Sequence, residues 1–407
     1  MLTFDEALAR LLAGAHPLAE AQAVPTLDAA GRVLAEDQFA TLDVPPLDNS
    51  AMDGYALRVA DLPAPGAVLP VAQRIPAGSV GSALQPGTAA RIFTGAPLPP
   101  GADAIVMQEL CEHADGGVRI NHLPQAGDHV RRAGSDIAAG QRILAAGRRL
   151  RPQDTALAAS VGIAQLPLLR RARVAVFFTG DELRMPGEAL PPGAIYNSNR
   201  FLLTALLAGL GCEVRDLGQV PDDLAATRAA LRAAAADSDL ILTSGGVSVG
   251  EEDHVKPAVE AEGRLDMWKI AIKPGKPLAF GEVDAGDDAG GRAVPFIGLP
   301  GNPVSSFVTF LMLVRPFILR LQGVAAPLTA PAACTLRADF DWPRPDARRE
   351  FLRARVNAEG GVELFANQGS GVLTSAVWAD GLVDNPPQQA IRRGDAVRFL
   401  PFSELLG

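Results

Sequence analysis

Val174-Ala-Val-Phe-Phe178 followed by Thr179-Gly-Asp-Glu182 gives the clearest indication of the fold, because an apolar strand ends there in a loop of small and acidic residues. From Arg171 onward, strands of this kind alternate with helix-forming segments. After the strand 174–178, helices are expected at 198–210, 222–235, 253–262 and 303–321, and strands at 213–217, 240–243, 267–272 and 294–297. Their alternation predicts a doubly wound α/β domain, a parallel sheet with helices on both faces. Ligands bind beyond the carboxyl ends of the strands in such sheets.

The segments on either side of this domain have different patterns. Thr3-Phe-Asp-Glu6 has the spacing of a capping box and predicts an N-terminal helix. Short apolar runs punctuated by Pro and Gly predict a β-rich module between Val44 and Ser135. Helix-forming sequence resumes near Asp154, so the segments that flank this module are expected to form one discontinuous domain. After Gly323 the pattern returns to short strands, which indicates a C-terminal β-barrel or sandwich.

Composition excludes several classes of protein. A formal net charge of -9 is unsuited to binding nucleic acid along its phosphate backbone. The first ten residues lack the basic and apolar segments of a secretory signal, and the most apolar stretch, 307–314, is shorter than the roughly 18 residues of a membrane span. Cys111, Cys212 and Cys334 have the spacing of neither a disulfide framework nor a zinc site. We expect a cytoplasmic protein, bound neither to nucleic acid nor to a membrane, whose ligand is a small anion.

Lysine is used in one place only. The chain has 33 arginines but four lysines, and these lie within 21 residues: Lys256, Lys269, Lys273 and Lys276. The compact charge of an ammonium group fits beside a small tetrahedral oxyanion where a planar guanidinium does not. Chance clustering or a solvated surface is the alternative interpretation.

Four loops fall at the expected ligand-binding edge of the sheet: 179–182, 243–248, 273–277 and 298–303. Each follows an apolar strand, and three lead into a helix, so unpaired backbone N–H groups can converge on an anion. We interpret the four loops as an oxyanion site, whereas the alternative is that they are only tight turns. The second loop supplies the substrate-binding candidates Ser244, Gly245, Gly246 and Ser248.

Carboxylates also collect at this edge. Glu182 follows the first strand, and Asp222 and Asp253 each precede an expected helix. Asp222 and Asp253 have the positions of helix N-caps. Carboxylates beside a phosphate-binding loop can instead hold Mg²⁺, and both roles can coexist. Glu182, Asp222 and Asp253 are therefore the predicted metal ligands.

Two other motifs do not fit the chain. Gly246-Val-Ser-Val-Gly250 matches the nucleophile elbow of α/β-hydrolases, but the only histidine after Ser248 is His254, six residues on. A serine-hydrolase triad needs an acid and then a histidine further downstream, so this interpretation is disfavoured. The phosphate-binding motif GxxxxGK[ST] is absent.

Seven segments together resemble the molybdopterin molybdenumtransferases, the MoeA family that includes the gephyrin E domain. They occur in family order and cover nearly the whole chain: Asp48–Ala56, Ile92–Pro97, Thr179–Leu183, Tyr196–Arg200, Ser244–Asp253, Lys273–Pro277 and Leu299–Val304. The resemblance implies a multidomain α/β protein with a discontinuous N-terminal domain (1–44 and 138–170) and an inserted β-rich domain (45–137). It further implies a molybdopterin-binding α/β domain (171–323) and a C-terminal β-barrel-like domain (324–407).

The resemblance also implies an activity. It is the Mg²⁺-dependent insertion of molybdate into adenylylated molybdopterin, with release of AMP, by a homodimer whose active site combines the α/β domain of one subunit with the inserted domain of the other. An upstream adenylylating protein would supply the substrate, and downstream molybdoenzymes would receive the cofactor. Two alternatives are a scaffold without catalysis, as in gephyrin, and the adenylylation step itself. The retained acids and lysines disfavour the first, and the three additional domains disfavour the second.

Site residues follow from the resemblance position by position. Those that match catalytic positions are Asp53, Thr94, Asp136, Glu182, Asp222, Asp253, Lys269 and Lys273. Those that match substrate-binding positions are Pro300 and Pro303, with Lys276, Arg353 and Ser370 at molybdate-handling positions. His254, Ser135 and Phe178 depart from the family pattern, which affects fine contacts.

Overall fold

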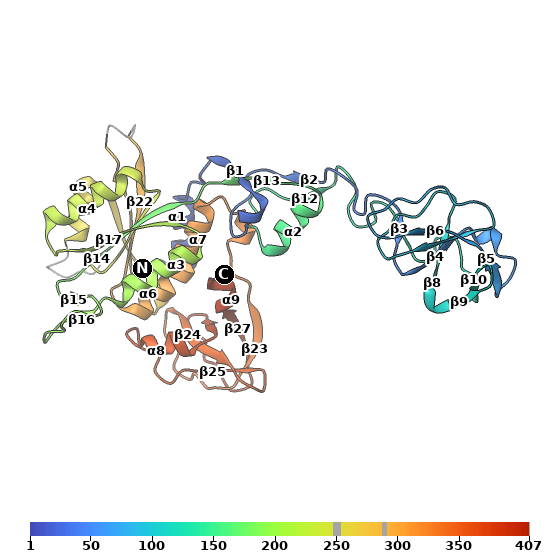
Figure 1. Cartoon of the computed structure of the whole chain (residues 1–407). Helices are drawn as coiled ribbons and strands as arrows, with labels where there is room; N and C mark the ends of the chain where they lie inside the picture. The colour runs from blue at the N-terminus through green and yellow to red at the C-terminus, as the bar shows by residue number, and fades with distance from the viewer. Residues whose placement is uncertain (247–253, 287–290, 407) are drawn as a thin grey trace.

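The computed structural model describes residues 1–246, 254–286 and 291–406. Most of the described elements gather in one body, and the inserted β-rich segment forms a second body at the end of a long arm (Figure 1). The inserted segment contains a four-stranded sheet of order β6-β7-β4-β8, a three-stranded sheet of order β5-β10-β9 and the short pair β11-β3. Its strands are β3 (Asn49–Ser50), β4 (Gly54–Leu57), β5 (Ala67–Leu69), β6 (Val71–Ile75), β7 (Ala89–Ile92), β8 (Ala104–Met107), β9 (Cys111–Ala114), β10 (Gly117–Ile120) and β11 (Val130–Arg131).

The N-terminal part pairs segments that are far apart in the sequence. Strand β1 (Ala21–Pro25) is antiparallel to β13 (Gln165–Leu169), and β2 (Gln38–Phe39) is antiparallel to β12 (Arg142–Leu144). Helix α2 (Pro152–Ser160) packs on the same part. The predicted discontinuous N-terminal domain is therefore confirmed, whereas the exact limits of all four domains stay a prediction. Helix α1 (Phe4–Ala13) begins with the predicted capping box of Thr3 and Glu6.

A six-stranded sheet of order β17-β14-β18-β22-β21-β19 forms the α/β domain. Its strands are β14 (Arg173–Thr179), β17 (Glu213–Val220), β18 (Leu240–Ser244), β19 (Gly263–Lys269), β21 (Pro277–Asp284) and β22 (Ala293–Leu299). Alternate side chains of β14 enter two cores: Val174, Val176 and Phe178 pack on the side of α3 (Ser198–Gly209), and Ala175 and Phe177 on the side of α4 (Leu224–Asp237) and α5 (Val255–Glu262). Helices therefore cover both faces, as the doubly wound prediction requires.

The sheet is mixed rather than wholly parallel, which corrects one part of the prediction. Strands β17, β14, β18 and β22 are parallel, but β21 is antiparallel to both β22 and β19. The sequence analysis missed β21 because it interpreted 273–277 as a loop without a strand to follow it. Since β19 and β22 each run opposite to β21, the carboxyl end of β19 still lies at the same edge as those of the parallel strands. The loop of lysines therefore stays at the ligand-binding edge.

The segment 303–321 is a helix with a local distortion. It divides into α6 (Pro303–Thr309), a short π-helix (Phe310–Val314) and α7 (Arg315–Leu321). Pro316 has no N–H to donate to the preceding turn, and a short π-helix is one way in which a helix absorbs such a missing bond. Among the described residues it is the one helix long and apolar enough to cross a membrane, but 94% of it is buried inside the protein, as in a core helix.

The C-terminal part is a closed five-stranded barrel. Its strands follow one another in the order β24-β25-β23-β27-β26, and β26 pairs with β24 to close the ring. They are β23 (Cys334–Ala338), β24 (Arg349–Val356), β25 (Gly361–Leu364), β26 (Gly381–Asn385) and β27 (Ala396–Pro401), with helices α8 (Leu373–Trp378) and α9 (Phe402–Leu406) beside them. The predicted barrel is confirmed. A further short strand, β20 (Ile272–Lys273), leaves the α/β domain and pairs in parallel with β24.

Candidate functional site

A cleft of about 1050 Å³ lies at the carboxyl edge of the α/β sheet. All four predicted loops line it, together with the segment 368–371 next to the barrel. The predicted site residues that line the cleft are Glu182, Asp222, Ser244, Gly245, Gly246, Lys273, Lys276, Pro300, Pro303 and Ser370. Loops that are separated by more than a hundred residues thus meet in one site, as the topology of the sheet requires.

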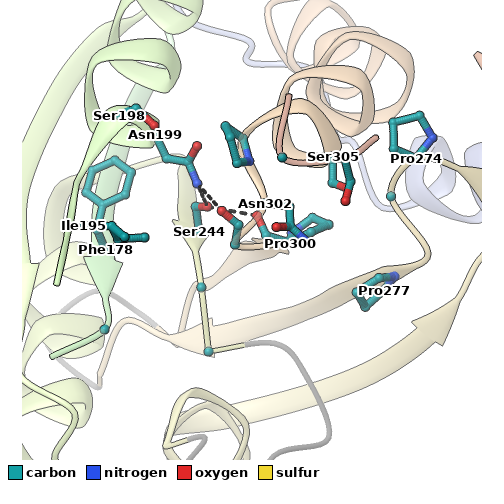
Figure 2. Close-up of a pocket in the computed structure, with 18 of the residues that line it drawn as sticks. Phe178, Ile195, Ser198, Asn199, Ser244, Pro274, Pro277, Pro300, Asn302 and Ser305 are labelled. Carbon is teal, nitrogen blue, oxygen red and sulfur yellow. Dashed lines mark hydrogen bonds between the residues drawn. The ribbon is translucent and has the colours of Figure 1, made fainter. Parts of the chain in front are cut away.

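Hydrogen bonds tie two of the loops together at the floor of the cleft (Figure 2). The Ser244 hydroxyl donates to the carbonyl of Pro300 at 3.0 Å and accepts from the Asn199 amide at 2.8 Å. The same amide donates to the carbonyl of Gly301 at 2.7 Å, and the Ser306 hydroxyl also donates to Pro300. The Ser244 loop and the Pro300 loop are therefore held in one fixed arrangement before any ligand binds.

Glycine is required where the loops approach each other most closely. Gly245 has φ +97°, and a Cβ atom there would lie 2.7 Å from the carbonyl oxygen of Thr179. Gly275 has φ +104°, and a Cβ atom there would meet the Thr309 hydroxyl. Both positions combine a left-handed backbone with a close neighbour, so any side chain would strain the loop.

The acidic wall of the cleft is formed by Glu182 and Asp222, which line it, with Asp181 hydrogen-bonded to Asp222 beside them. The backbone N–H of Asp181 donates to Asp222 Oδ2 at 3.3 Å, and the N–H of Asp222 donates to Asp181 Oδ1 at 3.4 Å. Burial raises the pKa of Asp222, and the charges of Asp181 and Glu182 raise it further. No arginine or lysine forms an ion pair with these three acids within the described part of the chain.

The cap of helix α4 corrects the prediction for Asp222. Its neighbour Asp223 is the N-cap, and the Asp223 carboxylate accepts from the N–H of Ala226 at 2.8 Å. Because Asp223 satisfies the helix end, Asp222 is free to face the cleft. Asp253, the other predicted helix N-cap, lies outside the described residues.

The cationic wall of the cleft consists of Lys273, Lys276 and Arg348. Lys273 Nζ lies 3.2 Å from Glu350 Oε1 and 3.4 Å from Asp346 Oδ2. The guanidinium of Arg348 makes two hydrogen bonds to Asp346, of 2.9 and 2.8 Å, which hold the pKa of that carboxyl well below its usual range. Lys276 is exposed, and its ammonium contacts no acid among the residues that the structure covers.

The chain matches three protein-family models along its length. Residues 2–162 match the MoeA N-terminal region (domain I and II), 175–320 match a probable molybdopterin binding domain, and 335–402 match the MoeA C-terminal region (domain IV). A molybdopterin molybdenumtransferase of Haemophilus influenzae is 39% identical over 415 residues, with 100% of both chains covered. The chain belongs to the molybdopterin molybdenumtransferase family. It is thus a transferase of molybdenum cofactor biosynthesis, as the resemblance implied.

Other family members and solved structures agree with this assignment. A molybdopterin molybdenumtransferase of Bacillus subtilis is 33% identical, with 90% of this chain and 86% of that protein covered. The crystal structure of a molybdopterin biosynthesis MoeA protein from Pyrococcus horikoshii superposes with a TM-score of 0.84 at 28% identity, covering 98% of this chain and 100% of that one. A second structure under that name superposes with a TM-score of 0.78 at 31% identity.

Some predicted site residues of this molybdopterin molybdenumtransferase family member lie away from the cleft. Lys269 is exposed at the end of β19, and Lys256 is a surface residue of α5, 3.9 Å from Glu260. Ser248 and Asp253 lie outside the described residues. Arg353 is buried, so it is placed behind the cleft rather than in its lining.

Arg353 supports the loop that carries Ser370. Its guanidinium donates to the Ser375 hydroxyl at 3.1 Å, to the Phe351 carbonyl at 3.1 Å and to the Gly369 carbonyl at 3.4 Å. Burial lowers the pKa of Arg353 to about 10. Its predicted contact with molybdate stays a prediction, and the observed contacts are those of a residue that holds the loop.

Asp53, Thr94 and Asp136 lie in the second body or on its arm (Figure 1). Asp53 Oδ1 accepts from both the N–H and the hydroxyl of Thr94 at 2.8 Å, and these bonds hold the pKa of Asp53 below its ordinary value. Asp136 is exposed. None of the three lines the cleft of its own chain.

Sequence reasoning missed two contributors to the cleft. Asn199 links the two floor loops, and Arg348 completes the cationic wall. The segment Tyr196–Arg200 was one of the family matches, and its two asparagines were a signal for Asn199. Arg348 offered no signal, because it is one of 33 arginines and precedes a strand of another domain.

Proposed function

We propose that this protein inserts molybdate into adenylylated molybdopterin and releases AMP, giving the molybdenum cofactor. The observation that carries the proposal is the opposite charge of the two walls that face one cleft at the sheet edge. The substrate brings phosphate groups and a metal-binding dithiolene, and the second substrate is a tetrahedral oxyanion. A cleft of about 1050 Å³ has room for both.

The acidic wall fits Mg²⁺. Asp222 is a carboxylate that burial and two neighbouring acids make costly to ionise, and an added cation would relieve that repulsion. The described residues hold no complete group of three His, Cys, Asp or Glu ligands. Mg²⁺ nevertheless often binds through one or two carboxylates with substrate phosphates and water completing its shell. We propose Glu182 and Asp222 as ligands, with Asp253 as the third; when bound, the ion would polarise phosphate oxygens.

The cationic wall fits molybdate. Lys273 and Lys276 would offset the charge of the oxyanion, with the Ser370 loop lining the same cleft and Arg353 holding that loop. Two buried polar atoms in the cleft lining, Thr179 Oγ1 and Asn199 Oδ1, have no hydrogen-bond partner among the described residues. Such atoms are costly to leave unpaired, so they are suited to bind polar groups of a substrate.

The inserted module supports a homodimer. Asp53, Thr94 and Asp136 lie apart from the cleft of their own chain, so we propose that a partner subunit supplies them. Mixing Asp53→Asn subunits with Lys273→Met subunits tests this, because one of the two shared sites in a mixed dimer would then be intact. We expect activity to return to about a quarter of the wild-type level, since half of the dimers would be mixed with half of their sites restored. Unmixed variants, each inactive, are the control, and no recovery in dimers shown to be mixed would contradict the shared site.

The activity itself is tested with purified protein, adenylylated molybdopterin, molybdate and Mg²⁺. We expect AMP release and a product that activates a molybdoenzyme freed of its cofactor. An upstream adenylylating protein would supply the substrate in the cell. If the protein instead forms adenylylated molybdopterin from molybdopterin and ATP, it performs the adenylylation step. If it folds and dimerises but releases no AMP, it is a scaffold.

A further inference from the structure

Glu350, in the C-terminal barrel, is the most completely enclosed carboxylate in the described part of the chain. Its side chain is 0% exposed. Glu350 Oε2 accepts hydrogen bonds from Trp342 Nε1 at 2.8 Å, from the N–H of Asp346 at 3.2 Å and from Asn385 Nδ2 at 3.3 Å. Its other oxygen faces Lys273 Nζ at 3.2 Å. All four of these groups are donors, and the one formal positive charge among them, on Lys273, comes from the cleft.

The backbone places Lys273 and Glu350 opposite each other. Strand β20 pairs with β24 in the register Ile272 to Arg349 and Lys273 to Glu350. The N–H of Arg349 also donates to the carbonyl of Ala271 at 2.9 Å. The lysine loop of one domain is therefore attached to the barrel by backbone pairing that includes the two residues of this ion pair.

The ion pair leaves Lys273 able to bind a ligand. An ammonium group has three N–H donors, and one of them is donated to Glu350 Oε1 at 3.2 Å, while Asp346 Oδ2 lies 3.4 Å away as an ion-pair partner. The Lys273 side chain is 40% exposed and lines the cleft, so it keeps a donor for an anion. Lys273, Lys276 and Arg348 carry three positive charges and Glu350 and Asp346 carry two negative ones, so this side of the cleft keeps a net positive charge.

We infer that Glu350 is a positioning residue for the transferase reaction: it holds the Lys273 ammonium at the oxyanion end of the cleft and so couples the barrel to the site. The inference rests on the proposed function in one respect, namely that Lys273 contacts molybdate. A long lysine side chain loses much of its freedom when it is held in place, so anchoring it in advance lowers the entropy lost when the oxyanion binds. A buried carboxylate is suited to this task because salt screens it less than an exposed one and its hydrogen bonds fix its orientation.

The test is a double-mutant cycle of Glu350→Gln and Lys273→Met. Glutamine keeps the size of the side chain and an acceptor for Trp342 but loses the charge. We expect Glu350→Gln to lower kcat about 10- to 100-fold, the order of loss for a misplaced catalytic group. Added to Lys273→Met, it should lower kcat less than about twofold further, because residues that act as a unit are non-additive. Independent losses that multiply would show a general structural role and overturn the inference.

A matched control comes from the same barrel. Glu363 pairs with Arg355 at 2.7 Å on the surface, and Glu363→Gln should leave kcat and both KM values unchanged. The KM for adenylylated molybdopterin should stay within about twofold in Glu350→Gln, because the acidic wall is untouched. If Glu350→Gln fails to fold, Glu350→Asp keeps the charge but shortens its reach. Its loss of kcat should likewise disappear in the Lys273→Met background, and persistence of the loss would overturn the inference.

Binding of molybdate alone separates this inference from the proposed function. Calorimetric titration with molybdate needs no turnover, and Glu350→Gln should raise the Kd about 3- to 10-fold in the wild-type background and not in the Lys273→Met background. If the wild-type protein releases no AMP but the titrations show this coupling, the activity is wrong and the positioning role stands. If AMP is released and Glu350→Gln matches wild type in both measurements, the positioning role is wrong.

Discussion

The two walls of the cleft carry opposite charges and are built in different ways. The acidic wall comes from the α/β domain alone, and no arginine or lysine forms an ion pair with Asp181, Glu182 or Asp222 in the part of the chain that is described. The cationic wall is built by two domains, and two of its three cations are already paired with acids: Lys273 with Glu350 and Asp346, and Arg348 with Asp346.

The difference shows which wall is complete in the free protein. Paired charges with fixed geometry are organised before binding and need little rearrangement. Three acids beside one another repel, and that repulsion falls when a cation or a proton binds. The cationic wall is therefore organised before an oxyanion binds, whereas the acidic wall would be completed by the Mg²⁺ ion proposed above.

Lys273→Met removes the centre of the cationic wall. AMP release should fall about 10²- to 10³-fold, as when a single oxyanion donor is removed from an active site. The matched control is Lys256→Met, because Lys256 is a surface residue whose nearest acid is Glu260 at 3.9 Å. Steady-state AMP release checks both. Equal losses in the two variants would mean that the lysine cluster acts through its overall charge and not through one site.

Asp222→Asn weakens the acidic wall. The reaction should slow about 10- to 100-fold at fixed Mg²⁺ and recover in part at higher Mg²⁺, because one carboxylate ligand is lost. Stability without metal should not fall, since a repelled charge has been removed. Asp223→Asn is the control one residue away: asparagine caps a helix as well as aspartate does, so activity and stability should both persist. An unchanged Mg²⁺ dependence in Asp222→Asn would remove Asp222 from the metal site.

Gly275→Ala disturbs the lysine loop without changing a charge. A left-handed alanine that also meets Thr309 should lower the free energy of unfolding by roughly 2 to 3 kcal/mol. Gly360→Ala is the control in the barrel. Gly360 has φ +77°, and a Cβ atom added there would have nothing within 4 Å, so only the cost of a left-handed backbone, about 1 kcal/mol, applies. Denaturant unfolding measures both. Equal losses would show that the loop relaxes around the added methyl group.

The smallest expected effect is on the pH dependence of the free energy of unfolding in metal-free buffer. It should have opposite signs for Asp222, in the acidic wall, and for Asp346, the acid paired with the cationic wall. The pKa of Asp222 is raised, so its unfavourable contribution is full above its folded-state pKa and disappears as pH falls toward the unfolded-state value. The pKa of Asp346 is lowered, so its favourable contribution is present above the unfolded-state pKa and is lost as pH falls through the folded-state value. At high pH Asp222→Asn should therefore have a larger free energy of unfolding than wild type, and Asp346→Asn a smaller one. Both differences should shrink as the pH falls. Differences of the same sign would refute the contrast.

Much of the site could be predicted from local sequence. The four loops and the Lys273 and Lys276 pair were identified because each loop follows an apolar strand, and parallel strands end at one edge. Asp223 as the cap of α4 was missed, since two adjacent aspartates before a helix look alike until the backbone is in place. Strand β21 was missed because local pattern does not say whether a strand turns back on its predecessor or crosses to the next.

The fold class, the family and the set of charged residues can be read from the sequence, because periodicity, loop composition and motif order are local properties of the chain. How those charges pair with one another depends on the folded structure. Lys273 and Glu350 are 77 residues apart and meet because β20 joins the barrel. Asp53 and Thr94 are likewise bound to each other across 41 residues, in a body separate from the cleft. Pairing of this kind depends on which strands lie side by side, and that is settled by packing over the whole chain rather than by any one segment.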